Sequence, residues 1–197
     1  MDNQAYHLDF ARVGKDVVIW PLAKIVSPQT ISIGDSVIID DFVFMAGGAH
    51  TSLGSFVHIA SHASLVGGGE LLVGDFTGIS SGSRVYSGND DYLGGSLTGP
   101  TVPEPFRRAI RTRTIIGRHV IIGANCVILP GVTIGDGAAI GANSLVTKDC
   151  EPWTVYVGSP VRALKPRPSE TMLALEAELR QALYDAQGNY IPKSERA

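Results

Sequence analysis

Large aliphatic residues recur at every sixth position in the C-terminal third of the chain. They stand at Ile116, Ile122, Ile128, Ile134, Ile140 and Val146. A period of six fits neither an α-helix, with 3.6 residues per turn, nor a strand that alternates with period two. It fits a chain that turns a corner every six residues, so that three short strands close one triangular coil. Successive coils then stack about 4.8 Å apart, with each aliphatic and the residue two before it facing the interior.

The same phase extends back to the N-terminus and predicts six coils. Their first aliphatic residues are Val13, Ile33, Leu53, Val73, Ile116 and Ile134. A glycine follows each of them, at Gly14, Gly34, Gly54, Gly74, Gly117 and Gly135. Stacked coils place these glycines in one column, where glycine permits positive φ or close approach of backbones. We therefore expect an all-β solenoid with a glycine column along one corner.

The extra residues of the repeat all fall at one corner. Steps within a coil are six residues, but four of the five steps between coils are longer and contain Ser27–Thr30, Gly47–His50, Gly67–Glu70 and residues 87–113. The last insertion is rich in glycine and proline and carries a basic cluster, Arg107, Arg108, Arg111 and Arg113. Loops of this length in compact domains are usually functional. A subunit-packing arm is the structural alternative.

The repeat ends near Asp149, and a helical pattern follows. Ser169 is a plausible N-cap, and Met172, Leu173, Leu175, Leu179 and Leu183 recur at helical spacing. We expect an amphipathic helix over residues 170–186 that caps the open end of the solenoid or packs subunits together. The predicted division is a solenoid domain at 1–168, with its loop at 87–113, and a helical tail at 169–197.

Composition narrows the class of protein. The net charge of −3 shows no basic excess of the kind that binds nucleic acid. No apolar run approaches the roughly 20 residues of a membrane span, and residues 1–10 lack a signal peptide. We therefore expect a cytoplasmic protein. Two cysteines make no disulfide framework, and Cys126 falls on an inward, small-residue position of the repeat.

Residues 115–167 resemble the hexapeptide acyltransferase superfamily. The most specific parts are GANCVILPGVTIGDGAAIGANSLVTKD and VGSPVRALK, which are similar to the closing coils of the galactoside, maltose and xenobiotic acetyltransferases. The resemblance implies a left-handed parallel β-helix, a homotrimer, and acetyl-CoA bound between adjacent prisms without a metal. Coenzyme-contacting positions of the family motif fall on Ala124, Ala142, Thr147, Lys148, Arg162 and Lys165. The three basic residues would hold the phosphates of the coenzyme.

Acyl transfer needs a base for the attacking hydroxyl or amine, and histidine is the usual choice. The galactoside-type enzymes carry it in the long loop within Thr-Gly-His, but here Ser87–Gly88–Asn89 stands in that place. Residues 49–69 are similar instead to the histidine-bearing coils of the amino-sugar N-acetyltransferases. That resemblance implies His50 or His58 as the base and gives His62 no matching role. Asp90 and Asp91, with Asn89 and Tyr92 beside them, are expected to hold the acceptor.

The sequence thus predicts an acetyl-CoA-dependent O- or N-acetyltransferase that acts on a saccharide or a nucleotide-linked amino sugar. Direct transfer is expected because no Cys or Ser stands beside a His in a nucleophile motif. Two other classes stay open. One is a γ-type carbonic anhydrase with zinc on His50, His58 and His62, although their spacing departs from that family. The other is a non-catalytic β-helix scaffold. The sequence leaves the acceptor, the acceptor atom and the acyl chain length undetermined.

Overall fold

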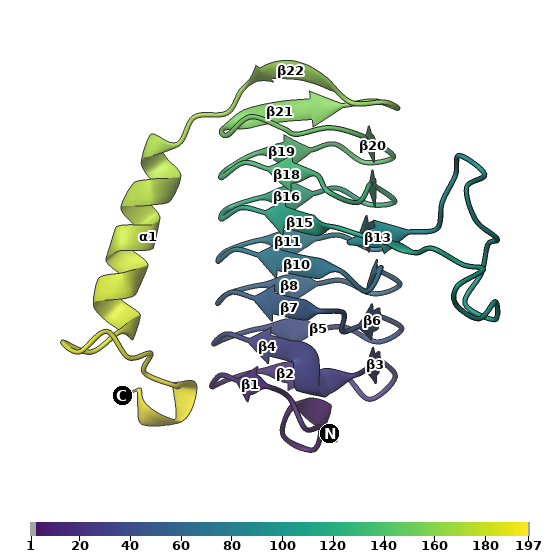
Figure 1. Cartoon of the computed structure of the whole chain (residues 1–197). Helices are drawn as coiled ribbons and strands as arrows, with labels where there is room; N and C mark the ends of the chain where they lie inside the picture. The colour runs from purple at the N-terminus through teal and green to yellow at the C-terminus, as the bar shows by residue number, and fades with distance from the viewer. Residues whose placement is uncertain (1–2, 197) are drawn as a thin grey trace.

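The computed structural model describes residues 3–196 as a three-sided solenoid, a left-handed parallel β-helix (Figure 1). Each side is one sheet, and we name the sides faces A, B and C. Face A consists of β1 (Arg12–Val13), β4 (Ile31–Ile33), β7 (His50–Leu53), β10 (Glu70–Val73), β15 (Arg113–Ile116) and β18 (Thr133–Ile134). Face B consists of β2 (Val18–Ile19), β5 (Ile38–Ile39), β8 (His58–Ile59), β11 (Gly78–Ile79), β16 (Ile121–Ile122), β19 (Ala139–Ile140), β21 (Thr154–Val157) and β22 (Arg162–Pro166). Face C consists of β3 (Lys24–Val26), β6 (Phe44–Ala46), β9 (Ser64–Val66), β12 (Arg84–Tyr86), β17 (Val127–Ile128) and β20 (Leu145–Val146).

The interior holds the residues that the six-residue period predicted. On face B, Ile19, Ile39, Ile59, Ile79, Ile122 and Ile140 stack in register and are almost fully buried. The residues two positions earlier, from Val17 to Ala138, are buried as well. Each coil therefore contributes its aliphatic residues to one continuous apolar column, which is the hydrophobic core of the solenoid.

The predicted glycine column lies at the corner between faces A and B, and its cause is close packing. A Cβ added to Gly34 would lie 2.6 Å from the carbonyl carbon of Gly54 in the next coil, so no larger residue fits. Positive φ occurs two residues later in each coil, for example at Ser36 and Phe56. The glycines are thus needed for the approach of neighbouring coils, and other residue types take the left-handed conformation.

All four insertions leave the prism at the corner between faces C and A, as the spacing predicted. One of the shorter ones contains the 3-10 helix Pro28–Thr30. The longest, residues 87–113, begins and ends as a two-stranded antiparallel ribbon of β13 (Gly88–Asn89) and β14 (Ile110–Arg111). Beyond the ribbon, β15 pairs with β10 as if the chain had not been interrupted. The loop therefore extends away from the prism without disturbing the ladder (Figure 1).

The end of the prism differs from the expectation. After the six predicted coils, Cys150 bridges Ile134 on face A and β21 adds a strand to face B, and β22 runs antiparallel to β21. This hairpin covers the upper end of the solenoid, so the helix is not its cap (Figure 1). The helix α1 spans Glu170–Leu183, three residues shorter than predicted, and runs along the side of the prism. Ser169 is the N-cap residue, as predicted, although its side chain makes no capping hydrogen bond.

Ion pairs hold α1 to the corner between faces A and B. Glu176, its one buried residue, pairs with Arg118 and His119 of the prism, and Arg180 pairs with Asp75. The predicted leucine stripe is therefore divided. Leu173 and Leu175 are 45% and 58% exposed. In the described part of the chain, no helix has the length and apolar character needed to cross a membrane. The short 3-10 helices Gln4–Tyr6 and Lys193–Glu195 lie near the ends of the described chain.

Candidate active site

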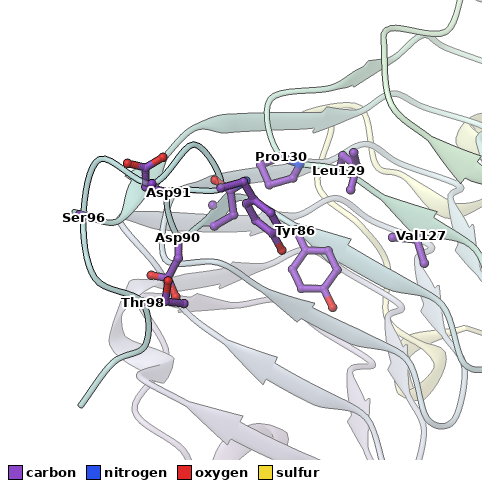
Figure 2. Close-up of a pocket in the computed structure, with 12 residues that line it drawn as sticks. Tyr86, Asp90, Asp91, Ser96, Thr98, Val127, Leu129 and Pro130 are labelled. Carbon is purple, nitrogen blue, oxygen red and sulfur yellow. The ribbon is translucent and has the colours of Figure 1, made fainter. Parts of the chain in front are cut away.

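A large recess opens between the extruded loop and the prism, with a volume of about 1040 Å³ (Figure 2). The prism contributes an apolar wall of Tyr86, Val127, Leu129 and Pro130 at the end of face C. The loop contributes a polar wall that includes the predicted acceptor-binding residues Asn89, Asp90, Asp91 and Tyr92, together with Ser96 and Thr98. We name this the loop recess. An apolar surface with a few convergent polar groups is typical of a small-molecule site.

Asp90 serves to hold the loop in shape. Its Oδ1 accepts hydrogen bonds from the guanidinium of Arg107, at 3.0 Å from Nε and 2.9 Å from Nη2. Its Oδ2 accepts a hydrogen bond from the backbone N–H of Gly99 at 3.0 Å. Both carboxylate oxygens are therefore occupied, and they join the start of the loop to its middle and to its return segment.

Asp91 is the carboxylate of the loop recess that retains a free oxygen. Its Oδ1 accepts the backbone N–H of Leu93 at 2.8 Å, which fixes the direction of the side chain. Its Oδ2 accepts no hydrogen bond from residues 3–196. Figure 2 shows Asp91 on the loop, across the recess from the wall that carries Leu129 and Pro130. An oriented carboxylate with one free oxygen can accept a proton or hold a donor of the acceptor molecule.

The basic cluster of the loop is largely structural. Arg107 binds Asp90, Arg111 donates to the carbonyl of Gly67, and Arg113 pairs with Glu70 at 3.0 Å. Arg108 is exposed and forms no ion pair within the described chain. Arg107 therefore joins two parts of the loop, whereas Arg111 and Arg113 fasten the end of the loop to the coils.

The upstream histidines lie outside the loop recess. His58, on face B, has its Nε2 3.0 Å from Asp40 Oδ2, and its side chain is 54% exposed. His50 is half-buried at the start of β7, on face A. His62 lies at the corner between faces B and C, where its ring stacks on Phe42. Within the described residues, no group of three His, Cys, Asp or Glu side chains could hold a metal ion.

Asp40, the partner of His58, was not identified from the sequence, although the repeat carries a signal for it. One regular coil with its insertion spans 20 residues, so Ile38 lies directly beneath His58. Asp40 follows two residues later at the end of the same strand. The offset of 18 residues between Asp40 and His58 in the hydrogen-bonded pair is thus the coil length less two.

The predicted coenzyme-binding residues lie along the upper coils. Ala124 and Ala142 stack at the corner between faces B and C, where the N–H of Asn143 donates to the carbonyl of Ala124 at 2.8 Å. Thr147 and Lys148 follow β20 at the other end of face C, and Arg162 and Lys165 lie on β22. Lys148, Arg162 and Lys165 are exposed and form no ion pair with any described residue. Their charges remain available to an anionic ligand.

Neither cysteine is placed to carry an acyl group. Cys126 is fully buried inside the solenoid, and Cys150 is 3% exposed. Burial raises the pKa of the Cys126 thiol, and it raises the pKa of Cys150 to about 11. Because the thiolate is the nucleophile, both side chains are inert near neutral pH. The described chain therefore supplies no cysteine for a covalent intermediate.

Comparison with known proteins identifies relatives over nearly the whole chain. Residues 113–148 match the family described as bacterial transferase hexapeptide (six repeats). A dTDP-4-amino-4,6-dideoxy-D-glucose acyltransferase of Escherichia coli is 39% identical over 175 residues, which cover 88% of this chain and 91% of the relative. A crystal structure of AntD, an N-acyltransferase from Bacillus cereus in complex with dTDP and 3-hydroxybutyryl-CoA, is 41% identical, with a TM-score of 0.84 over 89% of this chain and 93% of that chain. A chloramphenicol acetyltransferase of Agrobacterium fabrum is 43% identical over 67 residues, which cover 34% of this chain and 32% of the relative.

Proposed function

The chain belongs to the hexapeptide-repeat acyltransferases, and from that membership we propose that it transfers an acyl group from acyl-CoA to the amino group of a dTDP-linked 4-amino-4,6-dideoxy sugar. One observation carries the proposal. The likeness to the E. coli acyltransferase and to AntD covers the coils, the long loop and the closing hairpin together. The chloramphenicol acetyltransferase, which is matched over a third of this chain, is also named for the transfer of an acyl group, but not for a sugar acceptor.

The proposed active enzyme is a homotrimer with its sites between subunits. The distribution of candidate residues supports this assembly. The loop recess is at the corner between faces C and A, whereas Ala124 and Ala142 lie at the corner between faces B and C. A prism has flat sides, so these two groups can meet around one substrate only if the loop of one copy reaches the coils of another.

Asp91 is the proton acceptor of the proposed reaction. The lone pair of the sugar amine attacks the thioester carbonyl carbon, and the resulting adduct carries a positively charged nitrogen and an oxyanion. That nitrogen is far more acidic than the free amine, so a carboxylate is a sufficient base. The adduct then collapses with cleavage of the carbon–sulfur bond, and the CoA thiolate takes up the proton. The free Oδ2 of Asp91 in the loop recess supports this role.

His58 and His50 remain the alternatives predicted from the sequence. The hydrogen bond from His58 to Asp40 favours His58, because a carboxylate can orient an imidazole and stabilise its charged form. The His50 side chain makes no hydrogen bond among the described residues, but His50 lies on the strand that follows the insertion corner. Asp91→Asn, His58→Gln and His50→Gln separate the three assignments, because only loss of the base should lower kcat by about 100-fold or more.

The acyl donor would lie along the upper coils. An extended pantetheine arm can exchange hydrogen bonds with the backbone at the Ala124 and Ala142 corner, where small side chains leave the backbone accessible. Lys148, Arg162 and Lys165 are free to bind the coenzyme phosphates. We place the enzyme in the cytoplasm, where acyl-CoA is available.

Release of CoA from acetyl-CoA and 3-hydroxybutyryl-CoA, measured with dTDP-4-amino-4,6-dideoxyglucose as acceptor, tests the function. We expect acceptor-dependent release and a product that retains the nucleotide. Release that is equally fast with chloramphenicol and absent with the amino sugar would reject the proposed acceptor. Intersecting double-reciprocal lines are expected for direct transfer, whereas parallel lines with an isolable acylated protein would contradict it.

A further inference from the structure

Two corners of the prism carry stacked rings, and only one of them is covered. At the corner between faces A and B, Phe56, Phe76 and His119 stack with ring centroids 4.9 and 5.0 Å apart. At the corner between faces B and C, Phe42 and His62 stack at 5.0 Å with their planes 7° apart. The two stacks have the same geometry because both occupy the left-handed position of successive coils.

The stack between faces A and B is covered by α1 and the segment after it. Tyr184 and Tyr190 pack against Phe56, and the guanidinium of Arg180 lies 5.4 Å from the centre of the Phe76 ring. No corresponding segment of the described chain covers the other stack, where Phe42 is 54% exposed. An exposed aromatic ring loses the stabilisation that burial would supply. The uncovered pair therefore needs a reason outside the packing of one chain.

The fold does not require rings at this position. The same corner of the upper coils carries Gly82, Asn125 and Asn143, which adopt the left-handed conformation at low cost. Phenylalanine at φ 64° is less favourable there. A residue held in a less favourable conformation, with its side chain exposed, is an observation that points to function.

The exposed stack forms one wall of a second recess. Trp20, Asp40, Asp41, Phe42, Ser61 and His62 line this space of about 380 Å³, which we name the corner recess. Asp41 accepts the N–H of Leu22 through Oδ1 at 2.8 Å, and Asp40 binds His58 through Oδ2. The second oxygen of each carboxylate accepts no hydrogen bond from residues 3–196. A flat apolar wall thus stands beside two acceptors of N–H or O–H groups.

We propose that the corner recess binds the pyrimidine base of the nucleotide-linked acceptor, with the base stacked on Phe42 and His62; this inference rests on the proposed function. Base–aromatic stacking is the usual way that proteins hold a nucleobase. The free oxygens of Asp40 and Asp41 suit the ring N–H of a pyrimidine and a deoxyribose hydroxyl. Their negative charge excludes the diphosphate, which must lie further along the corner.

This placement orders the substrates along one edge of the prism. Phe42 belongs to the second coil, and Ala124 and Ala142 belong to the last two of the six coils at the same corner. The base therefore occupies the lower coils and the coenzyme the upper coils. The amino sugar lies between them, where the loop of a second copy supplies Asp91. His58, which is paired with Asp40 beside the pyrimidine, then belongs to the nucleotide-binding part of the site.

Calorimetric titration of dTDP and of CoA into wild-type protein and Phe42→Asn tests the proposal. Asparagine is the residue that the upper coils carry at this corner, so the variant retains the backbone conformation. We expect dTDP to bind about tenfold more weakly to Phe42→Asn, because stacking on the ring is lost, and CoA to bind unchanged. Methyl diphosphate, which has no base, should bind equally to the two proteins.

Equal dTDP affinity in the two proteins would overturn the inference while leaving the acyltransferase function intact. Weaker CoA binding by Phe42→Asn would assign the recess to the donor instead. Sedimentation of the variant is the second control, because dissociation into smaller species would make the stack a contact between copies. Wild-type protein that binds CoA but no dTDP would reject the proposed acceptor itself, and that failure is visible without any variant.

Discussion

Single residues at the corners decide whether neighbouring coils can approach. In the glycine column, the next coil occupies the place where a side chain would begin. Gly78 shows that the need for glycine depends on the position in the coil. It lies within a strand on face B, and an added Cβ there would meet no atom within 4 Å. The same residue type is therefore required where the next coil packs against it and is not required where space is free.

Gly34→Ala should destabilise the solenoid by about 1–3 kcal/mol, because the added methyl overlaps the backbone of Gly54 and the coils must separate. Urea unfolding of the two proteins measures the difference. The matched control is Gly78→Ala, where the free space predicts a change within about 0.5 kcal/mol. Equal losses for the two variants would show that the column is not set by close packing.

Among the elements, α1 is unusual because charge, more than apolar area, attaches it to the prism. Glu176 lies between Arg118, His119 and Arg180, at 2.7 Å from both His119 Nε2 and Arg180 Nε. Burial alone would raise the pKa of this carboxyl, but the hydrogen bonds from Arg180 and His119 and the charge of Arg118 outweigh it. The pKa of Glu176 is therefore lowered.

A lowered carboxyl pKa gives stability that is complete above the unfolded value, about 4.3 for glutamate, and is lost as the pH falls through the folded value. We therefore expect α1 to loosen in acid, below about pH 4, before the solenoid unfolds. Near-ultraviolet circular dichroism of Tyr184 and Tyr190, which pack against Phe56, reports the attachment. Glu176→Gln should cost about 1–3 kcal/mol at pH 7 and abolish this acid transition. An unchanged transition in the variant would refute the assignment to Glu176.

The extruded loop is the element whose shape depends most on one ion pair. Arg107→Ala removes the partner of Asp90 and should raise the KM for the amino sugar about tenfold, because the loop recess is no longer held in place. The KM for acyl-CoA and the unfolding midpoint should not change, since the loop lies outside the core. Arg108→Ala, at the exposed neighbouring position, is the control. Equal effects on both KM values would argue for a wider disturbance.

At the scale of the whole molecule, the proposed site joins the loop of one copy to the corner of another. Two inactive variants should then complement each other. Asp91→Ala damages the loop half, and Ala142→Arg blocks the corner half. Mixed trimers made by joint refolding at equal amounts should recover about a quarter of wild-type activity, because each interface has one chance in four of combining two intact halves. A mixture of two loop variants should recover none, and the same absence in the first mixture would place the site within one copy.

The sequence specified the solenoid because its cause is local and repeated. The six-residue spacing from Ile116 to Val146 predicts the coil. Counting residues between the aliphatic positions places all four insertions at one corner. The position of α1 follows from the pairing of Glu176 with Arg118 and His119, which are more than 50 residues away and outside any period. Of the two predicted roles of α1, capping of the prism was wrong, and packing of subunits stays a prediction. The sequence also named candidate histidines, which lie outside the loop recess, and their catalytic role stays a prediction.

The extruded loop leaves and rejoins the prism at adjacent points of an unbroken ladder, with β10 and β15 paired across the interruption. The packing of the core does not depend on the length or composition of this loop. Evolution can therefore replace this loop with another that binds a new acceptor, without changing the coils that carry the predicted coenzyme-binding residues. Chimaeras that exchange residues 87–113 between relatives offer a direct way to redirect such an enzyme.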